Sequence, residues 1–282
     1  MEISSYDVEE VVVERQEPKT KSLISTGDAA YVHSIESMSA VDGPGMRYLI
    51  FLTGCALRCI FCCNPDTLCL TSGKETTVDH LMKDIERKKP FLKTYPGGVS
   101  VSGGDPLLQH KFVAKLFQRV HDIGLTTCIA TSGIGSRASW ESVIPHSDFA
   151  IVCVKHFDRD MYKKLARADG LDRSLQFIEL CISRGVKVWL QYVLIPGYTT
   201  DDESLDLMVK YILKNKGNEN FQRVELLPYH TLGKKKWKEM GLEYILEGVK
   251  PPSAVERKRC LKYVKEAVHG PGGENVSPTI VM

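Results

Sequence analysis

The chain has 282 residues, of which 43% are hydrophobic and 26% are charged, as in a globular protein that buries a full core. Its formal net charge is only +2 and its basic residues are dispersed, which excludes the charged surface of a typical nucleic-acid-binding protein. No apolar run approaches the roughly 20 residues that cross a bilayer. We therefore expect neither a nucleic acid nor a membrane as a partner.

The first 26 residues carry six acidic side chains, which argues against a secretory signal and against an Arg-rich transit peptide. We interpret residues 1–26 as a mobile N-terminal extension, 27–270 as one domain and 271–282 as a C-terminal tail. The nine cysteines are a poor disulfide framework, since their number is odd and three of them crowd into one loop. We therefore expect the cytoplasm or another reducing compartment.

From residue 46 onward, apolar runs of strand length alternate with amphipathic stretches of helical length, which is typical of βα units around a parallel sheet. The runs that predict strands are 46–52, 98–102, 126–130, 149–153, 186–194 and 223–227. The stretches that predict helices are 78–91, 107–123, 138–144, 159–168, 174–184, 202–215 and 253–268. These units predict an α/β fold, a partial (β/α)6 barrel of TIM type with a parallel sheet and outer helices.

Unusual polar residues follow five of the six predicted strands. In parallel barrels the reactive residues lie where strands end and loops begin, so these positions are expected to face one common opening. In chain order they are the cysteine loop, Gly103-Gly104-Asp105, Thr131-Ser132-Gly133, Lys155 and Pro228-Tyr229-His230.

Three cysteines, Cys55, Cys59 and Cys62, lie within eight residues of the loop after the first strand. Three thiolates can hold an iron-sulfur cluster whose remaining iron keeps an open coordination site for a substrate. Two other interpretations stay open at this point. The triplet could bind structural zinc with Cys63, Cys69 or a distant residue as the fourth ligand, or it could consist of unrelated buried cysteines.

The spacing C-x3-C-x-aromatic-C, with Phe61 before the third cysteine, resembles the cluster motif of radical S-adenosylmethionine enzymes. The resemblance extends from about residue 31 to 268 and is closest to the glycyl-radical-enzyme activating family, in particular to activators of pyruvate formate-lyase. No ferredoxin-like insert of extra cysteines follows the motif, which distinguishes the chain from several other activators. The similar segments are 41–47, 62–67, 102–105, 188–189, 196–197, 225–230 and 248–252.

The resemblance implies an oxidoreductase that uses a 4Fe-4S cluster and S-adenosylmethionine. Cys55, Cys59 and Cys62 would be the metal ligands and the catalytic centre. Reductive cleavage of S-adenosylmethionine would give a 5'-deoxyadenosyl radical, which takes a hydrogen atom from a glycine of the partner. The implied partners are a glycyl-radical enzyme, foremost pyruvate formate-lyase, and an electron donor such as flavodoxin or ferredoxin. We expect a monomer that works in anaerobic metabolism.

The resemblance also implies a set of residues that bind the cofactor. Phe61 would stack on the adenine, although an aromatic residue in a loop is as often plain packing. Lys155 would pair with the cofactor carboxylate, unless it extends to solvent. The glycine pair would let the ligand approach the backbone, or would only form a turn. The full set is Phe61, Cys63, Asn64, Gly103, Gly104, Asp105, Val154, Lys155 and His230.

Several positions depart from the family pattern. Cys63 replaces a histidine and Asp105 replaces a glutamate, while Ala130, Cys153 and Gln191 replace two aspartates and an arginine. Hard cations require oxygen ligands, so we predict no monovalent-cation site beside the cofactor. An alternative function is therefore a catalytically degenerate relative that acts as an iron-sulfur or partner-binding protein. Another is an activase of a different glycyl-radical enzyme.

Two further segments are candidates for contact with the partner. The resemblance places Asp42 and Arg47 near the inserted loop of the glycyl-radical enzyme, whereas the alternative is a local turn with a surface ion pair. The basic run 230–237 could face a partner or only solvent. Trp237 favours contact, because exposed loops seldom contain a tryptophan without a function.

Overall fold

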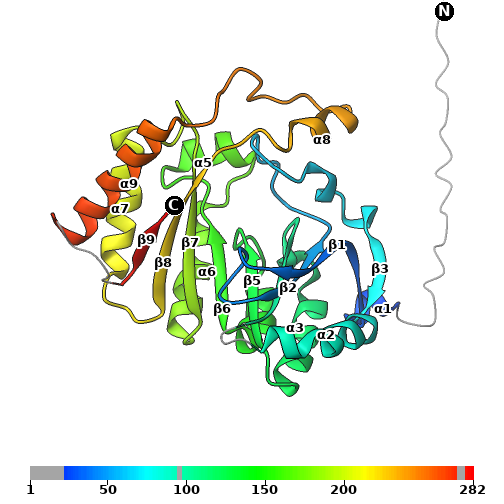
Figure 1. Ribbon diagram of the computed structural model, residues 1–282. Coiled ribbons are helices and arrows are strands. Elements are labelled where there is room, and N and C mark those ends of the chain that lie inside the picture. The colour runs from blue at the N-terminus through cyan, green and yellow to red at the C-terminus, as the bar shows by residue number, and fades with distance from the viewer. Residues whose placement is uncertain (1–21, 94–96, 272–276) are drawn as a thin grey trace, which may run out of the picture.

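The structure is a computed structural model that describes residues 22–93, 97–271 and 277–282 (Figure 1). Its described strands form one curved sheet in the order β3-β1-β2-β4-β5-β6-β7-β8-β9. All neighbours from β2 to β9 pair in parallel, whereas β1 pairs antiparallel with both β2 and β3. The strands are β1 Ala29–Ser39, β2 Arg47–Leu52, β3 Lys74–Thr77, β4 Gly98–Gly103, β5 Thr126–Thr131, β6 Phe149–Cys153, β7 Lys187–Leu194, β8 Phe221–Pro228 and β9 Thr279–Val281.

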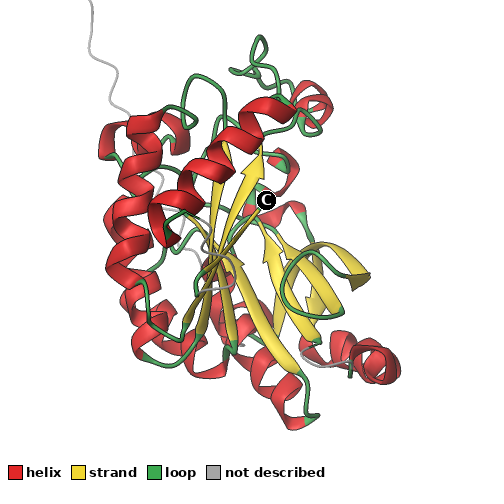
Figure 2. Cartoon of the chain, turned by 60° about the vertical axis from the view of Figure 1, so that its left-hand side comes forward, coloured by secondary structure: helices red, strands yellow, loops and turns green. Residues whose placement is uncertain are grey.

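Helices connect the parallel strands and pack along the outer side of the sheet (Figures 1 and 2). Their first turns are fixed by N-cap side chains: Thr77, Asp158, Asp201 and Ser253 each accept a hydrogen bond from a backbone N–H of the following turn. The helices are α1 Leu23–Thr26, α2 Val78–Leu92, α3 His110–Asp122, α4 Arg137–Val143, α5 Arg159–Ala166, α6 Leu171–Ser183, α7 Asp202–Asn215, α8 Lys234–Glu239 and α9 Ala254–His269. Short 3-10 turns are η1 Pro65–Thr67, η2 Leu70–Ser72, η3 Pro106–Gln109 and η4 Ile144–His146.

The two faces of the sheet carry different side chains. Outward residues such as Val99, Val101 and Leu190 join the main hydrophobic core with the helices. On the inner face, alternate residues of neighbouring strands meet in a smaller cluster of Cys128, Phe149, Ile151 and Trp189, with Ala130 packed against it. This alternation follows from the period of two along a strand. The inner face is therefore distinct from the core and available for a site.

The structure confirms the predicted fold class, with six parallel βα units in sequence order from β2 to β8. Three strands (β1, β3 and β9) and two helices (α1 and α8) were not predicted. β1 has six exposed residues in a row and β9 has only three residues, so neither shows a strand pattern. β9 lies in the predicted C-terminal tail but pairs with β8. Of the predicted N-terminal extension, residues 1–21 lie outside the described residues. Its last residues, Leu23–Thr26, form α1.

Within the described residues, no helix is both long enough and apolar enough to cross a membrane.

Candidate functional site

The cysteine loop leaves the C-terminal end of β2 and is fixed to the neighbouring element by backbone hydrogen bonds. The N–H groups of Arg58 and Ile60 donate to the carbonyls of Ala166 and Leu165 at the end of α5, each at 2.9 Å. The backbone of the three cysteines is thereby positioned by contacts far along the chain. All nine cysteines are free thiols, including those of the triplet.

The triplet is a donor set that needs a metal to become anionic. Burial, with smaller contributions from neighbouring thiolates, raises the pKa of Cys59 to about 12 and that of Cys62 to about 11. Burial also raises the pKa of Cys55. A bound soft metal centre reverses this effect, because thiolates coordinate iron directly. The chemistry of these three thiols therefore fits an iron-sulfur cluster.

A site for a single metal ion requires a different arrangement of ligands from a site for an iron-sulfur cluster. Among the described residues, no three His, Cys, Asp or Glu side chains converge as ligands of one ion would. The ligands of a cluster each bind a different iron, so they need not converge on one point. The described residues therefore contain no preformed site of the kind that a structural zinc ion would occupy.

Lys155 lies next to the cysteine loop, as the arrangement of strand ends predicted. Its Nζ is 5.9 Å from the ring centroid of Phe61, within cation–π range. Burial alone would lower the pKa of Lys155, but the negative charges of Cys153 and Cys59 in their thiolate forms, which a bound metal centre would favour, outweigh burial and raise it well above its ordinary value. A cation and an aromatic face thus lie together beside the buried Cys59.

Gly103 and Gly104 are required by the contact of β4 with β2 and its loop. Gly103 has φ +113°, and a Cβ there would be 2.1 Å from the carbonyl oxygen of Leu52. A Cβ on Gly104 would be 2.2 Å from the carbonyl oxygen of Gly54. The pair is therefore explained by close backbone packing at the start of the cysteine loop, whatever it also does for a ligand.

Asp105 is buried and bound by protein donors on both oxygens. It accepts hydrogen bonds from the Thr131 hydroxyl at 2.6 Å, the Ser132 N–H at 3.0 Å and the Leu107 N–H at 3.1 Å, and also from the Ser132 hydroxyl. Its carboxylate joins the ends of β4 and β5. In the described contacts it therefore positions the Thr131-Ser132 turn.

Asp105→Asn is expected to lower the free energy of unfolding by about 2–3 kcal/mol, because the amide NH2 would face donors in a buried site. Urea unfolding followed by far-UV circular dichroism measures the change. The matched control is Asp160→Asn, since Asp160 is exposed in the first turn of α5. Equal unfolding midpoints for Asp105→Asn and the unmodified protein would contradict this role.

The other predicted cofactor residues differ in burial and in their contacts. Val154 is fully buried and its N–H donates to the carbonyl of Gln191 at 3.1 Å. Cys63 and His230 are exposed at the ends of the cysteine loop and of β8. The side-chain oxygen of Asn64 accepts a hydrogen bond from Lys236 at 2.9 Å, a contact that local sequence did not indicate.

The inner face carries a polar cluster that the sequence analysis did not assemble. Glu225 accepts a hydrogen bond from the Gln191 amide at 2.9 Å and forms an ion pair with Arg223 at 3.2 Å. The Arg223 guanidinium lies 4.5 Å from the ring of Trp189. The signal was present in β7 and β8, where these polar or aromatic residues alternate with buried apolar ones.

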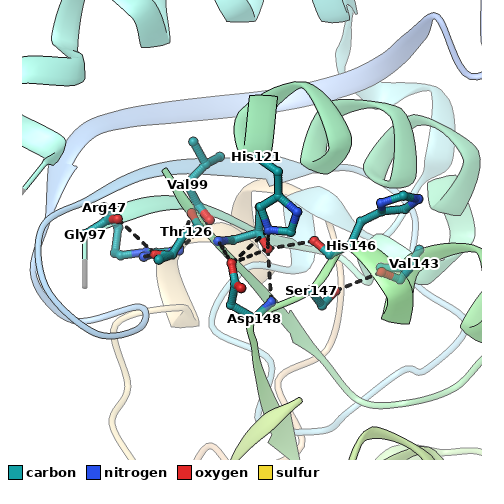
Figure 3. Close-up of polar contacts among 10 residues, drawn as sticks. Arg47, Gly97, Val99, His121, Thr126, Val143, His146, Ser147 and Asp148 are labelled. Atoms are coloured by element: carbon teal, nitrogen blue, oxygen red, sulfur yellow. Dashed lines mark hydrogen bonds and ion pairs between the residues drawn. The ribbon is translucent and has the colours of Figure 1, made fainter. Parts of the chain in front are cut away.

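Asp42 and Arg47, predicted together, lie in different environments. The Asp42 carbonyl accepts a hydrogen bond from the Ser100 hydroxyl of β4 at 2.6 Å, and burial raises the pKa of its carboxyl. Arg47 is 0% exposed and hydrogen-bonded at the N-terminal ends of the strands (Figure 3). Because Arg47 is buried, the alternative of a surface ion pair is wrong for it and it is not accessible to a partner, whereas the Asp42 carboxylate accepts a hydrogen bond from the nearby Ser39 hydroxyl at 3.3 Å.

Trp237 is buried rather than exposed, so its predicted contact with a partner is wrong. Its indole N–H donates to the carbonyl of Cys62 at 2.8 Å, and its ring packs against Tyr244 with centroids 5.6 Å apart. The tryptophan therefore fastens α8 to the third cysteine of the loop.

Comparison with known proteins adds independent observations. Residues 49–208 match the family model described as the Radical SAM superfamily. The chain is 39% identical to the pyruvate formate-lyase-activating enzyme of Clostridium pasteurianum, over 83% of this chain and 97% of the relative. It is 36% identical to the pyruvate formate-lyase 1-activating enzyme of Escherichia coli K12, over 84% and 96%.

Solved structures resemble the fold at low sequence identity. Streptococcus suis SuiB bound to its precursor peptide SuiA aligns with a TM-score of 0.61 at 15% identity, covering 83% of this chain and 48% of that chain. A radical SAM methyltransferase from Sphaerobacter thermophilus aligns with a TM-score of 0.57 at 15% identity, covering 84% and 66%. These two structures support the architecture alone.

Proposed function

Because the chain belongs to the radical SAM superfamily and, within it, to the pyruvate formate-lyase-activating enzymes, we propose that it activates pyruvate formate-lyase through the site around Cys59. When bound, the 4Fe-4S cluster and S-adenosylmethionine supply a 5'-deoxyadenosyl radical that abstracts hydrogen from a glycine of the partner. The observation that carries the proposal is the three-cysteine loop around the buried Cys59, with the Lys155 cation 5.9 Å from the ring of Phe61 in the same loop.

Each residue of the site has a distinct part in this proposal. Cys55, Cys59 and Cys62 hold the cluster, with Cys59 the buried ligand and the other two partly exposed. Lys155 attracts the carboxylate of S-adenosylmethionine, because a partly buried ammonium is stabilised by an anion. Phe61 offers an aromatic face beside that cation. Asp105 keeps the Thr131-Ser132 turn in place next to the ligand.

The partner glycine must reach the inner face of the sheet. Asp42, Gln191, Arg223 and Glu225 lie there and offer donors and acceptors for the backbone of an inserted segment. The guanidinium of Arg223 is oriented by Glu225 and by Trp189, so less entropy is lost when it binds a carbonyl group. We infer that this inner-face cluster positions the glycine.

Arg223→Gln is expected to lower the yield of glycyl radical per 5'-deoxyadenosine about tenfold, the loss that corresponds to about 1.4 kcal/mol of positioning. Formation of 5'-deoxyadenosine without the partner should change less than about twofold. Electron paramagnetic resonance measures the radical, and chromatography measures the nucleoside.

Arg223→Lys, which keeps the charge, should recover part of the yield. The matched control is Lys187→Gln, which removes a cation at the N-terminal end of β7, where it stacks on Phe149. If Arg223→Gln leaves the yield of glycyl radical per 5'-deoxyadenosine unchanged, Arg223 does not position the glycine.

A degenerate, non-catalytic relative is the second candidate, and one observation favours it. Gln191, where the family has an arginine, is committed to Glu225, and Ala130 and Cys153 offer no oxygen ligand. The test is production of 5'-deoxyadenosine by anaerobically reconstituted and reduced protein, followed by glycyl radical formation on pyruvate formate-lyase. Nucleoside and radical support the activase. A cluster-loaded protein that forms no nucleoside would be the degenerate relative.

A further inference from the structure

The segment 230–250, which includes α8, is an exposed basic surface. It contains five lysines and three glutamates, a net charge of +2 that equals the formal charge of the whole chain. Lys235 and Lys238 are exposed. Lys238 forms no ion pair within the described part of the chain, and Lys235 has only the exposed Glu239 at 3.6 Å. Such a pair contributes little, so both charges are available to a partner.

Exposed apolar side chains lie among these lysines. Leu232 is 80% exposed, and Met240, Leu242 and Ile245 of the same segment are 41–42% exposed, so the segment presents several apolar side chains rather than a single one. Protein interfaces combine apolar contacts with charged groups around them. We call this the α8 surface, formed by Leu232, Lys234, Lys235, Lys238, Met240, Leu242 and Ile245, with the exposed Glu239, Glu243 and Glu247 among them.

The α8 surface is attached directly to the cysteine loop (Figure 1). Besides the hydrogen bond from Trp237 to the Cys62 carbonyl, Gly233 lies so close that a Cβ would be 2.7 Å from the Cα of Cys63. Lys236 continues the contact through an ion pair with Asp66 at 3.0 Å. A protein bound on the outer side of α8 would therefore be separated from the loop by Trp237 and little else.

We propose that the α8 surface docks an acidic one-electron carrier, a flavin or iron-sulfur protein, that reduces the cluster held by the three cysteines. The proposal rests on the proposed function, because only a redox-active cluster needs such a carrier. One electron leaves the reduced carrier, which is thereby oxidised, and enters the cluster, which is reduced. No atom or proton is exchanged across the interface, and no bond forms or breaks there.

The carrier fits this surface better than the glycyl-radical enzyme does. Hydrogen-atom transfer requires that the glycine reach the radical itself, and the inner-face cluster offers contacts for that approach. Electron transfer tolerates an intervening layer of protein, here the Trp237 indole and the Cys62 peptide. A positive surface also increases the rate of encounter with an acidic partner.

The test uses the full-length, cluster-loaded protein with the double charge reversal Lys235→Glu/Lys238→Glu. The control is Lys258→Glu/Lys262→Glu on α9, which changes the net charge equally at two exposed lysines, one of them also in an i,i+4 pair with a glutamate. Each protein is reduced either by an acidic flavodoxin or by dithionite, and 5'-deoxyadenosine is measured. The dissociation constant for flavodoxin is measured separately, so that docking has a readout besides activity.

We expect the α8 variant to lose about tenfold in rate with flavodoxin, to bind flavodoxin about tenfold more weakly, and to keep its rate with dithionite within about twofold. The control Lys258→Glu/Lys262→Glu should match the unmodified protein in the rate with flavodoxin, in the rate with dithionite and in the affinity for flavodoxin. Added salt should slow the unmodified protein with flavodoxin and affect the α8 variant much less.

Unchanged flavodoxin binding in the α8 variant overturns the proposal, and so does an equal loss of rate with both reductants, which would place these lysines in the cleavage site. A loss only of glycyl radical formation under dithionite would assign the surface to the lyase and also overturn the proposal. Absence of nucleoside from the unmodified protein would instead contradict the proposed function, and the binding measurement would still decide the docking site.

Discussion

Cys59→Ala is expected to abolish cluster assembly and, with it, all formation of 5'-deoxyadenosine. Cys59 is the most buried thiol of the triplet, at 9% exposure. With only two of the three cysteines left, a second iron of the cluster would have no protein ligand. Iron and acid-labile sulfide per chain measure the cluster after anaerobic reconstitution. The protein itself should stay folded, because alanine is smaller and apolar and the loop keeps its backbone hydrogen bonds to α5.

The matched control for this variant is Cys69→Ala. Cys69 lies seven residues after the triplet and is exposed, with its sulfur 3.7 Å from the Thr71 hydroxyl. It should keep full iron and sulfide content. Equal cluster content in Cys59→Ala and the unmodified protein would show that the ligand assignment is wrong. Stoichiometric zinc without sulfide in the unmodified protein would support the structural zinc interpretation instead.

Sequence patterns predicted those parts of the fold that depend on local physics. The bounds of β6 and α7 agree with their predicted ranges, 149–153 and 202–215. β6 is an uninterrupted apolar run, and α7 begins at an acidic cap, Asp201, followed by amphipathic residues. β1 and β9 have no such pattern, since they are strands only through the partner they pair with.

In the candidate site, too, some contacts follow from patterns in the sequence and others do not. The meeting of Lys155 with the cysteine loop followed from the rule that parallel strands end at one edge of the sheet. The hydrogen bond from Trp237 to Cys62 joins residues 175 positions apart and depends on how a long loop folds back, which no local signal reports. Asp105 had the expected position, but its four protein donors became apparent only when the β5 turn was placed against it.

Arg47→Met is the second change with a large expected effect, and its effect is on stability. The guanidinium donates to the Val99 carbonyl and the Thr126 hydroxyl, each at 2.6 Å (Figure 3). It also donates to the Ser100 hydroxyl at 2.9 Å, so that it joins β2, β4 and β5 at their N-terminal ends. Burial lowers the pKa of Arg47 from its ordinary value, which reflects the cost of keeping this charge away from water.

Two effects oppose each other in this substitution. Removing a buried charge recovers its desolvation cost, and an apolar residue can replace a buried ionic group without loss when its partners are also replaced. Here the partners stay: the Val99 carbonyl and two hydroxyls would each lose a charged donor, although the hydroxyls keep the hydrogen bonds that they donate to the Asp42 and Gly97 carbonyls. A hydrogen bond to a charged group contributes about 1.5–3 kcal/mol. We therefore expect a net loss of about 3 kcal/mol in the free energy of unfolding.

The consequence of Arg47→Met should extend to the inner face. The Ser100 hydroxyl that Arg47 orients donates to the Asp42 carbonyl at 2.6 Å, so the loop that carries Asp42 depends on the same network. Urea unfolding should show a midpoint lower by about 1 M with an unchanged slope. Arg119→Met, which removes only the exposed pair with Asp79, should cost less than about 1 kcal/mol. If both variants unfold at the same midpoint, the buried guanidinium contributes no more than a surface ion pair.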